Sequence, residues 1–226
     1  MKLPGPAVRA VLFDLDGTLV DSAADLHGAM NTLLERRGFA ALSLDQVISM
    51  IGHGIRTLVE RAFKFHDTPL AGHELDRAAA EMTDIYSTRL TQSTTLLPGA
   101  AEAVAALASM GVAQGVVTNK PRAATDEILA HFGLLAQMGA VVGGDSGLPR
   151  KPAPDMILSA LDTLGIEPAE AVMVGDSPAD IDSARAAGVR AIAVRGGYTP
   201  VSADEFGADA VIDTLADLVP LLPLGD

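Results

Sequence analysis

Short apolar segments alternate with longer segments of helical periodicity in the chain beyond residue 98. In the longer segments, apolar side chains recur every three or four positions, which is typical of an amphipathic helix. Gly133 and Gly165 follow two such segments, at the place where helices commonly end. The alternation predicts a parallel sheet with helices on its faces. Together with an apolar segment at residues 10–13, the predicted strands are 112–117, 140–142, 171–174, 191–194 and 210–212.

Residues 21–95 lack this alternation, and helical periodicity extends through the whole segment. One apolar stripe begins at Leu26, and Ser43 precedes another at a position where it can cap a helix. We therefore expect residues 1–20 and 96–226 to form an α/β core and residues 21–95 to form an inserted helical domain. Because the insert follows the first strand, it should lie over the end of that strand. The periodicity alone does not define the order of the strands.

The composition narrows the classes of protein that the chain can belong to. Of its 226 residues, 49% are hydrophobic and 20% are charged, as in ordinary globular domains. The absence of cysteine excludes disulfides, thiolate metal sites and cysteine nucleophiles. A formal net charge of -13 argues against nucleic acid or an anionic membrane as a partner, because both attract basic surfaces. No apolar segment is long enough to span a bilayer and no signal peptide is recognisable, so we expect a cytoplasmic protein.

Two acidic residues follow the first predicted strand. Asp14 ends the strand, and Asp16 comes just before a turn at Gly17. Ligands of open α/β sheets bind beyond the carboxyl ends of the strands, which is where both side chains should lie. Asp21 or Ser22 could cap the helix that follows. Two carboxylates one residue apart at this place predict a catalytic site.

Further polar residues stand near the ends of other predicted strands. Thr118 and Asn119 follow strand 112–117, Lys151 precedes a helical segment, and Asp176 and Asp180 follow strand 171–174. Taken alone, each is most simply a turn residue, a solvated lysine or a helix cap. Together they place several polar features at the same end of one sheet. This combination favours a shared site over independent turns.

These motifs resemble those of the haloacid dehalogenase superfamily, and the resemblance extends over essentially the whole chain. It implies a Rossmann-like parallel sheet core with an inserted alpha-helical cap domain, the cap being residues 21–95. The motifs that carry it are Asp-Leu-Asp-Gly-Thr-Leu-Val-Asp-Ser from Asp14, Thr118-Asn119, Lys151-Pro152 and Gly-Asp-Ser-x-x-Asp from Gly175.

The resemblance also implies a role for each motif residue. Asp14 would be the nucleophile toward phosphorus and Asp16 the general acid and base, while Gly17, Thr118 and Asn119 would bind the phosphoryl group. Forming an acyl phosphate on a carboxylate divides one difficult displacement into two easier ones. A halide leaving group needs no proton, so the presence of an acid at Asp16 argues against a dehalogenase.

The remaining implied roles belong to the charges around the nucleophile. Lys151 would be a catalytic residue whose positive charge stabilises the negative charge around Asp14. Asp14, Asp16 and Asp176 would hold Mg²⁺, with Asp16 contributing its backbone carbonyl. Asp180 would complete the metal-binding motif with Asp176, either by orienting Lys151 or by contacting a metal-bound water. Mg²⁺ prefers hard oxygen ligands and would offset the repulsion between the carboxylate and a phosphate dianion.

The segment 51–62 resembles the cap of phosphoglycolate phosphatases, and Gly143-Gly144-Asp145 resembles part of their core. The implied activity is hydrolysis of 2-phosphoglycolate to glycolate and phosphate. His53 and Arg56 could receive the carboxylate of that substrate, but they could equally be solvated residues near the end of a helix.

Three other activities remain open: a phosphatase for hexose or amino-sugar phosphates, a phosphomutase, or a non-catalytic binding module of the same fold. The intact acid at Asp16 counts against the last of these. We expect the partner to be a small-molecule phosphate monoester, with no nucleic acid and no membrane, and the protein to be a monomer or homodimer.

Overall fold

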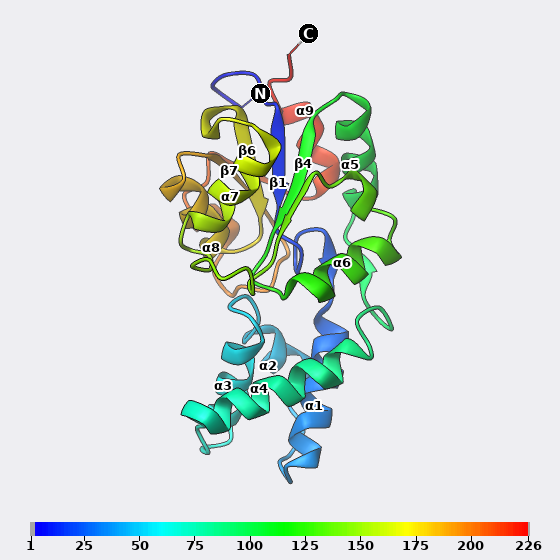
Figure 1. Ribbon diagram of the computed structural model, residues 1–226, viewed down its shortest axis with the longest axis vertical. Coiled ribbons are helices and arrows are strands. Elements are labelled where there is room, and N and C mark those ends of the chain that lie inside the picture. The colour runs from blue at the N-terminus through cyan, green and yellow to red at the C-terminus, as the bar shows by residue number, and fades with distance from the viewer. Residues whose placement is uncertain (1–2, 226) are drawn as a thin grey trace.

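A computed structural model describes residues 3–225, and its centre is a six-stranded parallel sheet (Figure 1). The strand order is β5-β4-β1-β6-β7-β8, so the first strand lies in the interior of the sheet and pairs on both sides with strands that come much later in the chain. All six predicted strands are present: β1 (Ala10–Phe13), β4 (Ala113–Val117), β5 (Ala140–Val142), β6 (Ala171–Gly175), β7 (Arg190–Val194) and β8 (Ala210–Ile212).

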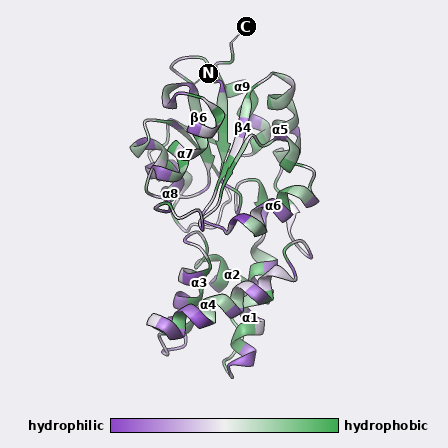
Figure 2. Ribbon diagram, viewed as in Figure 1, coloured by the Kyte–Doolittle hydropathy of each residue, from purple (hydrophilic) through white to green (hydrophobic). Residues whose placement is uncertain are grey.

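Alternate side chains of the sheet pack against helices on its two faces. Leu12 of β1 packs in the cluster that includes Met156 and Ile181, and its neighbours Val11 and Phe13 pack in the other cluster. Figure 2 shows the strands as largely hydrophobic inside the layer of helices. One face is covered by α7 (Asp155–Leu164) and α8 (Pro178–Ala186); the other is covered by α5 (Ala100–Ser109), α6 (Arg122–His131) and α9 (Leu218–Leu221).

The segment from residue 23 to residue 87 is helical, as the periodicity predicts, and lies at the carboxyl ends of the parallel strands (Figure 1). Within it, α1 packs against α2 and α4, and α3 packs against α4. These helices are α1 (Ala23–Arg36), α2 (Leu44–Ile48), α3 (Ile55–Phe65) and α4 (Gly72–Ser87). Short 3-10 helices complete the core at Leu135–Gln137, Pro168–Glu170, Ala203–Glu205 and Leu215–Asp217. No helix of the described residues is long and apolar enough to cross a membrane.

The chain leaves the core and returns to it through a two-stranded antiparallel ribbon that the sequence pattern did not predict. Strands β2 (Val20–Asp21) and β3 (Thr95–Leu96) pair with each other beside the end of β1. Two residues are too few to show the alternation by which strands are recognised. The ribbon fixes the position where the four helices α1 to α4 join the sheet. These four helices are called the helical layer below.

Local capping follows the sequence expectations in part. Ser43 and Gln46 form a capping box at the start of α2, and Gly165 ends α7 in the left-handed conformation. At the start of α1, the carboxylate of Asp21 accepts the N–H of Ala23 at 3.1 Å. The hydroxyl of Ser22 does not cap this helix, because it donates to a carboxylate in the site described below.

Candidate active site

The first acidic residue lies directly beyond the central strand. The backbone N–H of Asp14 donates to the carbonyl of Val174 at 2.9 Å and so continues the pairing of β1 with β6. Gly17 then turns the chain with a φ of +87°, and a Cβ at this position would collide with the carboxylate of Asp176. Both the backbone angle and the lack of space require glycine here. The turn therefore allows the motif after β1 to lie against the loop after β6.

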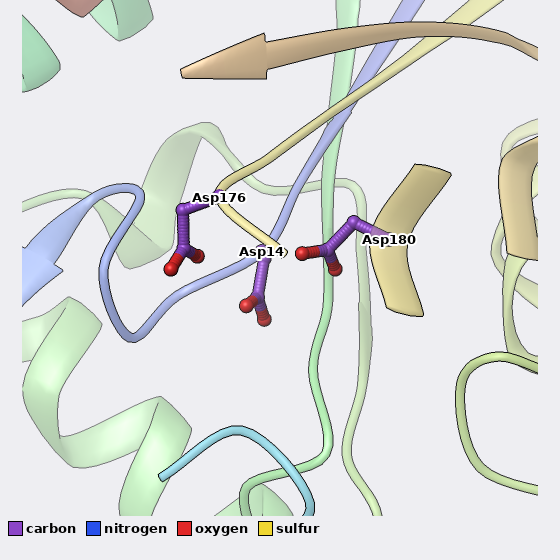
Figure 3. Close-up of side chains that lie close together, drawn as sticks. All are labelled: Asp14, Asp176 and Asp180. Carbon is purple, nitrogen blue, oxygen red and sulfur yellow. The ribbon is translucent and has the colours of Figure 1, made fainter. Parts of the chain in front are cut away.

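Three buried carboxylates gather at this edge of the sheet. One oxygen of each of Asp14, Asp176 and Asp180 lies within 4.8 Å of the others, and Figure 3 shows Asp14 between the other two. The ammonium of Lys151 is 2.9 Å from Asp14 Oδ1 and 2.5 Å from Asp180 Oδ1, and it donates to the carbonyl of Val117 at 2.7 Å. Three carboxylates thus face a single ammonium, and the ionised cluster carries a net charge of two negative units.

This crowding changes the acidity of the cluster. Burial raises the pKa of Asp14 from 3.8 to about 6, although the charge of Lys151 opposes the change. Burial and the neighbouring charges of Asp180 and Asp14 raise the pKa of Asp176 well above its ordinary range. Burial alone would lower the pKa of Lys151, but the two carboxylates beside it outweigh that effect and raise it. A divalent cation would relieve the repulsion among the carboxylates.

The hydrogen bonds within the cluster indicate which oxygens could bind such a cation. Asp14 Oδ1 is buried and, apart from the ammonium of Lys151 at 2.9 Å, has no donor among the described residues. Both oxygens of Asp180 are engaged, one by Lys151 and the other by the N–H and hydroxyl of Ser177 at 3.0 and 2.6 Å. Each oxygen of Asp176 accepts one hydrogen bond. The donor set consists of hard oxygens, which suits Mg²⁺.

Asp16 is held by Ser22 and by Lys120, and the sequence had suggested no part in the site for Lys120 or for Tyr86 beside it. Lys120 Nζ donates to Asp16 Oδ1 at 2.7 Å and to Oδ2 at 2.9 Å, and the hydroxyl of Ser22 donates to Oδ1 at 2.5 Å. The same ammonium donates to the hydroxyl of Tyr86 on α4 at 2.8 Å. Lys120 directly follows Thr118-Asn119 beyond a strand, and that position could have indicated it. Tyr86 falls in an apolar helical stripe and resembles a core residue.

The residues predicted to bind the phosphoryl group lie next to the acidic pair, but most of their polar atoms have partners. The side-chain amide of Asn119 donates to the carbonyls of Gly52 and Lys151 at 3.1 and 3.2 Å, so it joins the helical layer to the core. Thr118 Oγ1 accepts the N–H of Lys120 at 3.3 Å. The N–H of Gly17 is used within its own turn, where it donates to Val20.

A cavity of about 40 Å³ lies between the helical layer and the core. Its core side includes the two acidic residues of the first motif, Thr118 and Asn119, and its other side is mostly apolar. A more open hollow of about 370 Å³ shares Asp14 and Asp16 with the cavity. Both spaces therefore give a small molecule access to the same two carboxylates.

The two predicted cap contacts, His53 and Arg56, lie in different surroundings. His53 lines the open hollow together with Arg61, whose guanidinium is 3.4 Å from His53 Nδ1. Arg56 is exposed, lines neither space and pairs with Asp76 at 2.9 Å. Of these two arginines, Arg61 is the one that shares a hollow with Asp14 and Asp16. The sequence pattern alone did not show which of the two would lie there.

A parallel sheet that presents an aspartate pair, a buried lysine and an acidic cluster beneath a helical layer defines a class of hydrolase. The family model described as haloacid dehalogenase-like hydrolase matches residues 11–194, and the chain belongs to this family. It is an enzyme, a phosphoric monoester hydrolase similar to phosphoglycolate phosphatases.

Named relatives cover nearly the whole chain. A phosphoglycolate phosphatase from Rhodospirillum rubrum is 39% identical over 214 residues, which are 93% of this chain and 89% of the relative. One from Agrobacterium fabrum is 35% identical over 217 residues, covering 96% of this chain and 93% of the relative.

Solved structures agree with this assignment. The structure of a predicted phosphoglycolate phosphatase from Haemophilus somnus aligns with a TM-score of 0.88 at 30% sequence identity. The alignment covers 94% of this chain and 97% of that structure's chain. CbbY from Rhodobacter sphaeroides, solved in complex with phosphate, aligns with a TM-score of 0.82 at 26% sequence identity. The alignment covers 96% of this chain and 100% of the CbbY chain.

Proposed function

We propose that the enzyme hydrolyses 2-phosphoglycolate to glycolate and phosphate through an acyl phosphate on Asp14, with Mg²⁺ as cofactor. The observation that carries the proposal is the state of Asp14 itself. Apart from its ion contact with Lys151 at 2.9 Å, its buried Oδ1 accepts no hydrogen bond from the described residues, and Asp14 lines the cavity of about 40 Å³. A nucleophile needs such a free oxygen, because a fully hydrogen-bonded carboxylate would have to break contacts before attacking.

The reaction takes place in two displacements. In the first, a carboxylate oxygen of Asp14 bonds to phosphorus, the ester P–O bond breaks, and Asp16 gives its proton to the departing alkoxide. In the second, Asp16 takes a proton from water, the water oxygen bonds to phosphorus, and the acyl phosphate bond breaks to restore Asp14. Lys151 offsets the negative charge that gathers near Asp14 in both displacements.

The carboxylates of Asp14 and Asp176 would hold Mg²⁺ together with the backbone carbonyl of Asp16. Asp180 supports this arrangement through its bonds to Lys151 and Ser177, because both of its oxygens are already engaged. The ion would supply positive charge that reduces the repulsion between the phosphate dianion and the buried carboxylates. The net charge of the acidic cluster matches a divalent cation.

Residues 21–95 are the proposed cap domain, and residues 1–20 and 96–226 the proposed catalytic core. In this arrangement Thr118 contributes its hydroxyl to phosphoryl binding, with the backbone near Asn119 and Gly17 close to it. His53, with Arg61 beside it, lines the hollow and is the proposed contact of the substrate carboxylate. Arg56 would have to leave Asp76 to take part.

The choice of 2-phosphoglycolate rests on the similarity to phosphoglycolate phosphatases over almost the full chain. A sugar phosphate is a second candidate, because the hollow of about 370 Å³ offers more room than a two-carbon ester needs. CbbY has also been solved with xylulose-1,5-bisphosphate, and that structure has a TM-score of 0.80 and 25% identity to this chain.

Phosphate release from a panel of monoesters, measured with and without Mg²⁺, tests the proposal. The panel contains 2-phosphoglycolate, hexose phosphates and an amino-sugar phosphate. We expect preference for 2-phosphoglycolate, no need for a bisphosphate activator, and loss of activity in excess chelator that Mg²⁺ restores. Full activity in chelator would refute the metal requirement, and preference for a hexose phosphate would replace the proposed substrate with the second candidate.

A further inference from the structure

Lys120 occupies the centre of a polar contact between the helical layer and the core. Its side chain is 3% exposed, and its ammonium has three N–H donors and three acceptors: the two oxygens of Asp16 and the hydroxyl of Tyr86. The ammonium also lies 4.8 Å from the centre of the Tyr86 ring, within the range of a cation–π contact. All three donors are therefore used, and the position of the ammonium is fixed from both sides.

The two oxygens of Asp16 are held unequally. Oδ1 accepts from Lys120 at 2.7 Å and from the hydroxyl of Ser22 at 2.5 Å, whereas Oδ2 accepts only from Lys120 at 2.9 Å. A carboxylate oxygen that accepts fewer hydrogen bonds keeps more lone-pair capacity for a further partner. Oδ2 is therefore the oxygen of Asp16 with more capacity left for a hydrogen bond to a leaving oxygen or to water.

We propose that Lys120, held by Tyr86, is a positioning residue that fixes the orientation of Asp16 for proton transfer in both displacements, with Oδ2 as the freer oxygen. This inference rests on the proposed function and deepens it. When the ester bond breaks, the proton moves from Oδ2 to the leaving oxygen, and the carboxylate formed is neutralised by Lys120. When water attacks, its proton returns to Oδ2, and the group is restored.

The contacting residues come from both the helical layer and the core, so their hydrogen bonds join these two parts of the chain. Tyr86 belongs to α4 of the helical layer, whereas Lys120 follows β4 and Asp16 follows β1 of the core. Tyr86 therefore reaches Lys120, and so supports the hold on Asp16, only when α4 rests against the core. A positioning role of this kind predicts a specific chemical defect: loss of Lys120 or of the Tyr86 hydroxyl should harm proton transfer more than phosphoryl binding.

Two small substrates separate proton transfer from the other steps. The alkoxide that leaves 2-phosphoglycolate needs a proton, whereas the acetate that leaves acetyl phosphate does not. The experiment measures single-turnover consumption of each substrate by the Mg²⁺-loaded wild-type enzyme, Lys120→Met and Tyr86→Phe. In a single turnover, the rate of substrate consumption depends on the first displacement alone. In steady state, a slow second displacement would hide a change in that rate. Lys64→Met is the matched control, because Lys64 is exposed on α3 and lies outside both spaces of the site.

We expect Lys120→Met to consume 2-phosphoglycolate about 100-fold more slowly than the wild type, the usual scale of a lost acid catalyst, and acetyl phosphate only a few-fold more slowly. Tyr86→Phe keeps the ring and removes one neutral hydrogen bond, so its loss on 2-phosphoglycolate should be about fivefold, with almost none on acetyl phosphate. Lys64→Met should match the wild type on both.

Equal losses on the two substrates, in variants whose thermal unfolding matches that of the wild type, would overturn the positioning role and leave the proposed function intact. A wild-type enzyme that consumes neither substrate would overturn the proposed function and this inference with it. If Lys120→Met does not fold, the selective loss or its absence in Tyr86→Phe decides the question.

Discussion

The buried carboxylate of Asp14 should destabilise the metal-free protein at neutral pH. Replacing Asp14 with asparagine keeps the shape of the side chain and removes its charge. The folded protein raises the pKa of Asp14 from 3.8 to about 6, which means that the folded state resists ionisation of this carboxyl. That difference corresponds to about 3 kcal/mol of lost stability once the group is fully ionised. We therefore expect metal-free Asp14→Asn to be more stable than the metal-free wild type by up to about 3 kcal/mol.

The effect has a defined pH window. Below a pH of 3.8, Asp14 is protonated in both the folded and unfolded states and contributes no difference. Between that value and about 6, the unfolded state loses its proton first, so the stability of the wild type falls as the pH rises. The advantage of Asp14→Asn should be small near pH 4, about half developed near pH 5, and complete above about pH 7.

Urea unfolding in excess chelator at several pH values measures this difference. Asp162→Asn, which alters an exposed carboxylate on α7, is the control and should change stability by less than about 0.5 kcal/mol at every pH. Adding Mg²⁺ should stabilise the wild type more than Asp14→Asn and narrow the gap. A variant less stable than the wild type throughout, or a gap that does not depend on pH, would refute the reasoning.

Three further outcomes follow from the site. Asp16→Asn should still form a trappable phosphoenzyme but release phosphate about 100-fold more slowly, and wild-type release in a quenched time course would remove its acid-base role. Arg61→Ala should raise KM for 2-phosphoglycolate about tenfold, more than Arg56→Ala does; equal effects in steady-state kinetics would return Arg56 to the pocket. Gly17→Ala should lower the unfolding temperature and activity together, since its Cβ meets Asp176; an unchanged melting curve would contradict the steric reasoning.

The sequence predicted the six strands of the core and the helical character of the insert because both depend on local periodicity. It also predicted that Asp14, Thr118, Lys151 and Asp176 meet, because polar residues after parallel strands share one edge of a sheet. These inferences needed no knowledge of strand order. The order β5-β4-β1-β6-β7-β8 depends on long-range pairing and had to come from the structure.

The contacts between the helical layer and the core were beyond the reach of local patterns. Tyr86 has the spacing of a core residue, and only its approach to Lys120 gives its hydroxyl a polar partner. Arg56 and Arg61 lie five positions apart on one helix, but only the packing of α3 decides which of them lines the hollow. Side-chain roles at an interface between two parts of a chain depend on how those parts pack.

The short ribbon of β2 and β3 has a consequence for how this architecture can vary. Val20 pairs with Leu96, so the chain departs from the sheet and comes back at adjacent points. A segment anchored in this way adds little strain to its host whatever its length, because the closure entropy of a loop grows only slowly with the number of residues. Replacement of the helical insert by a shorter or longer one should therefore leave the parallel sheet able to fold, which makes this junction a natural point for exchanging substrate-binding modules by recombination.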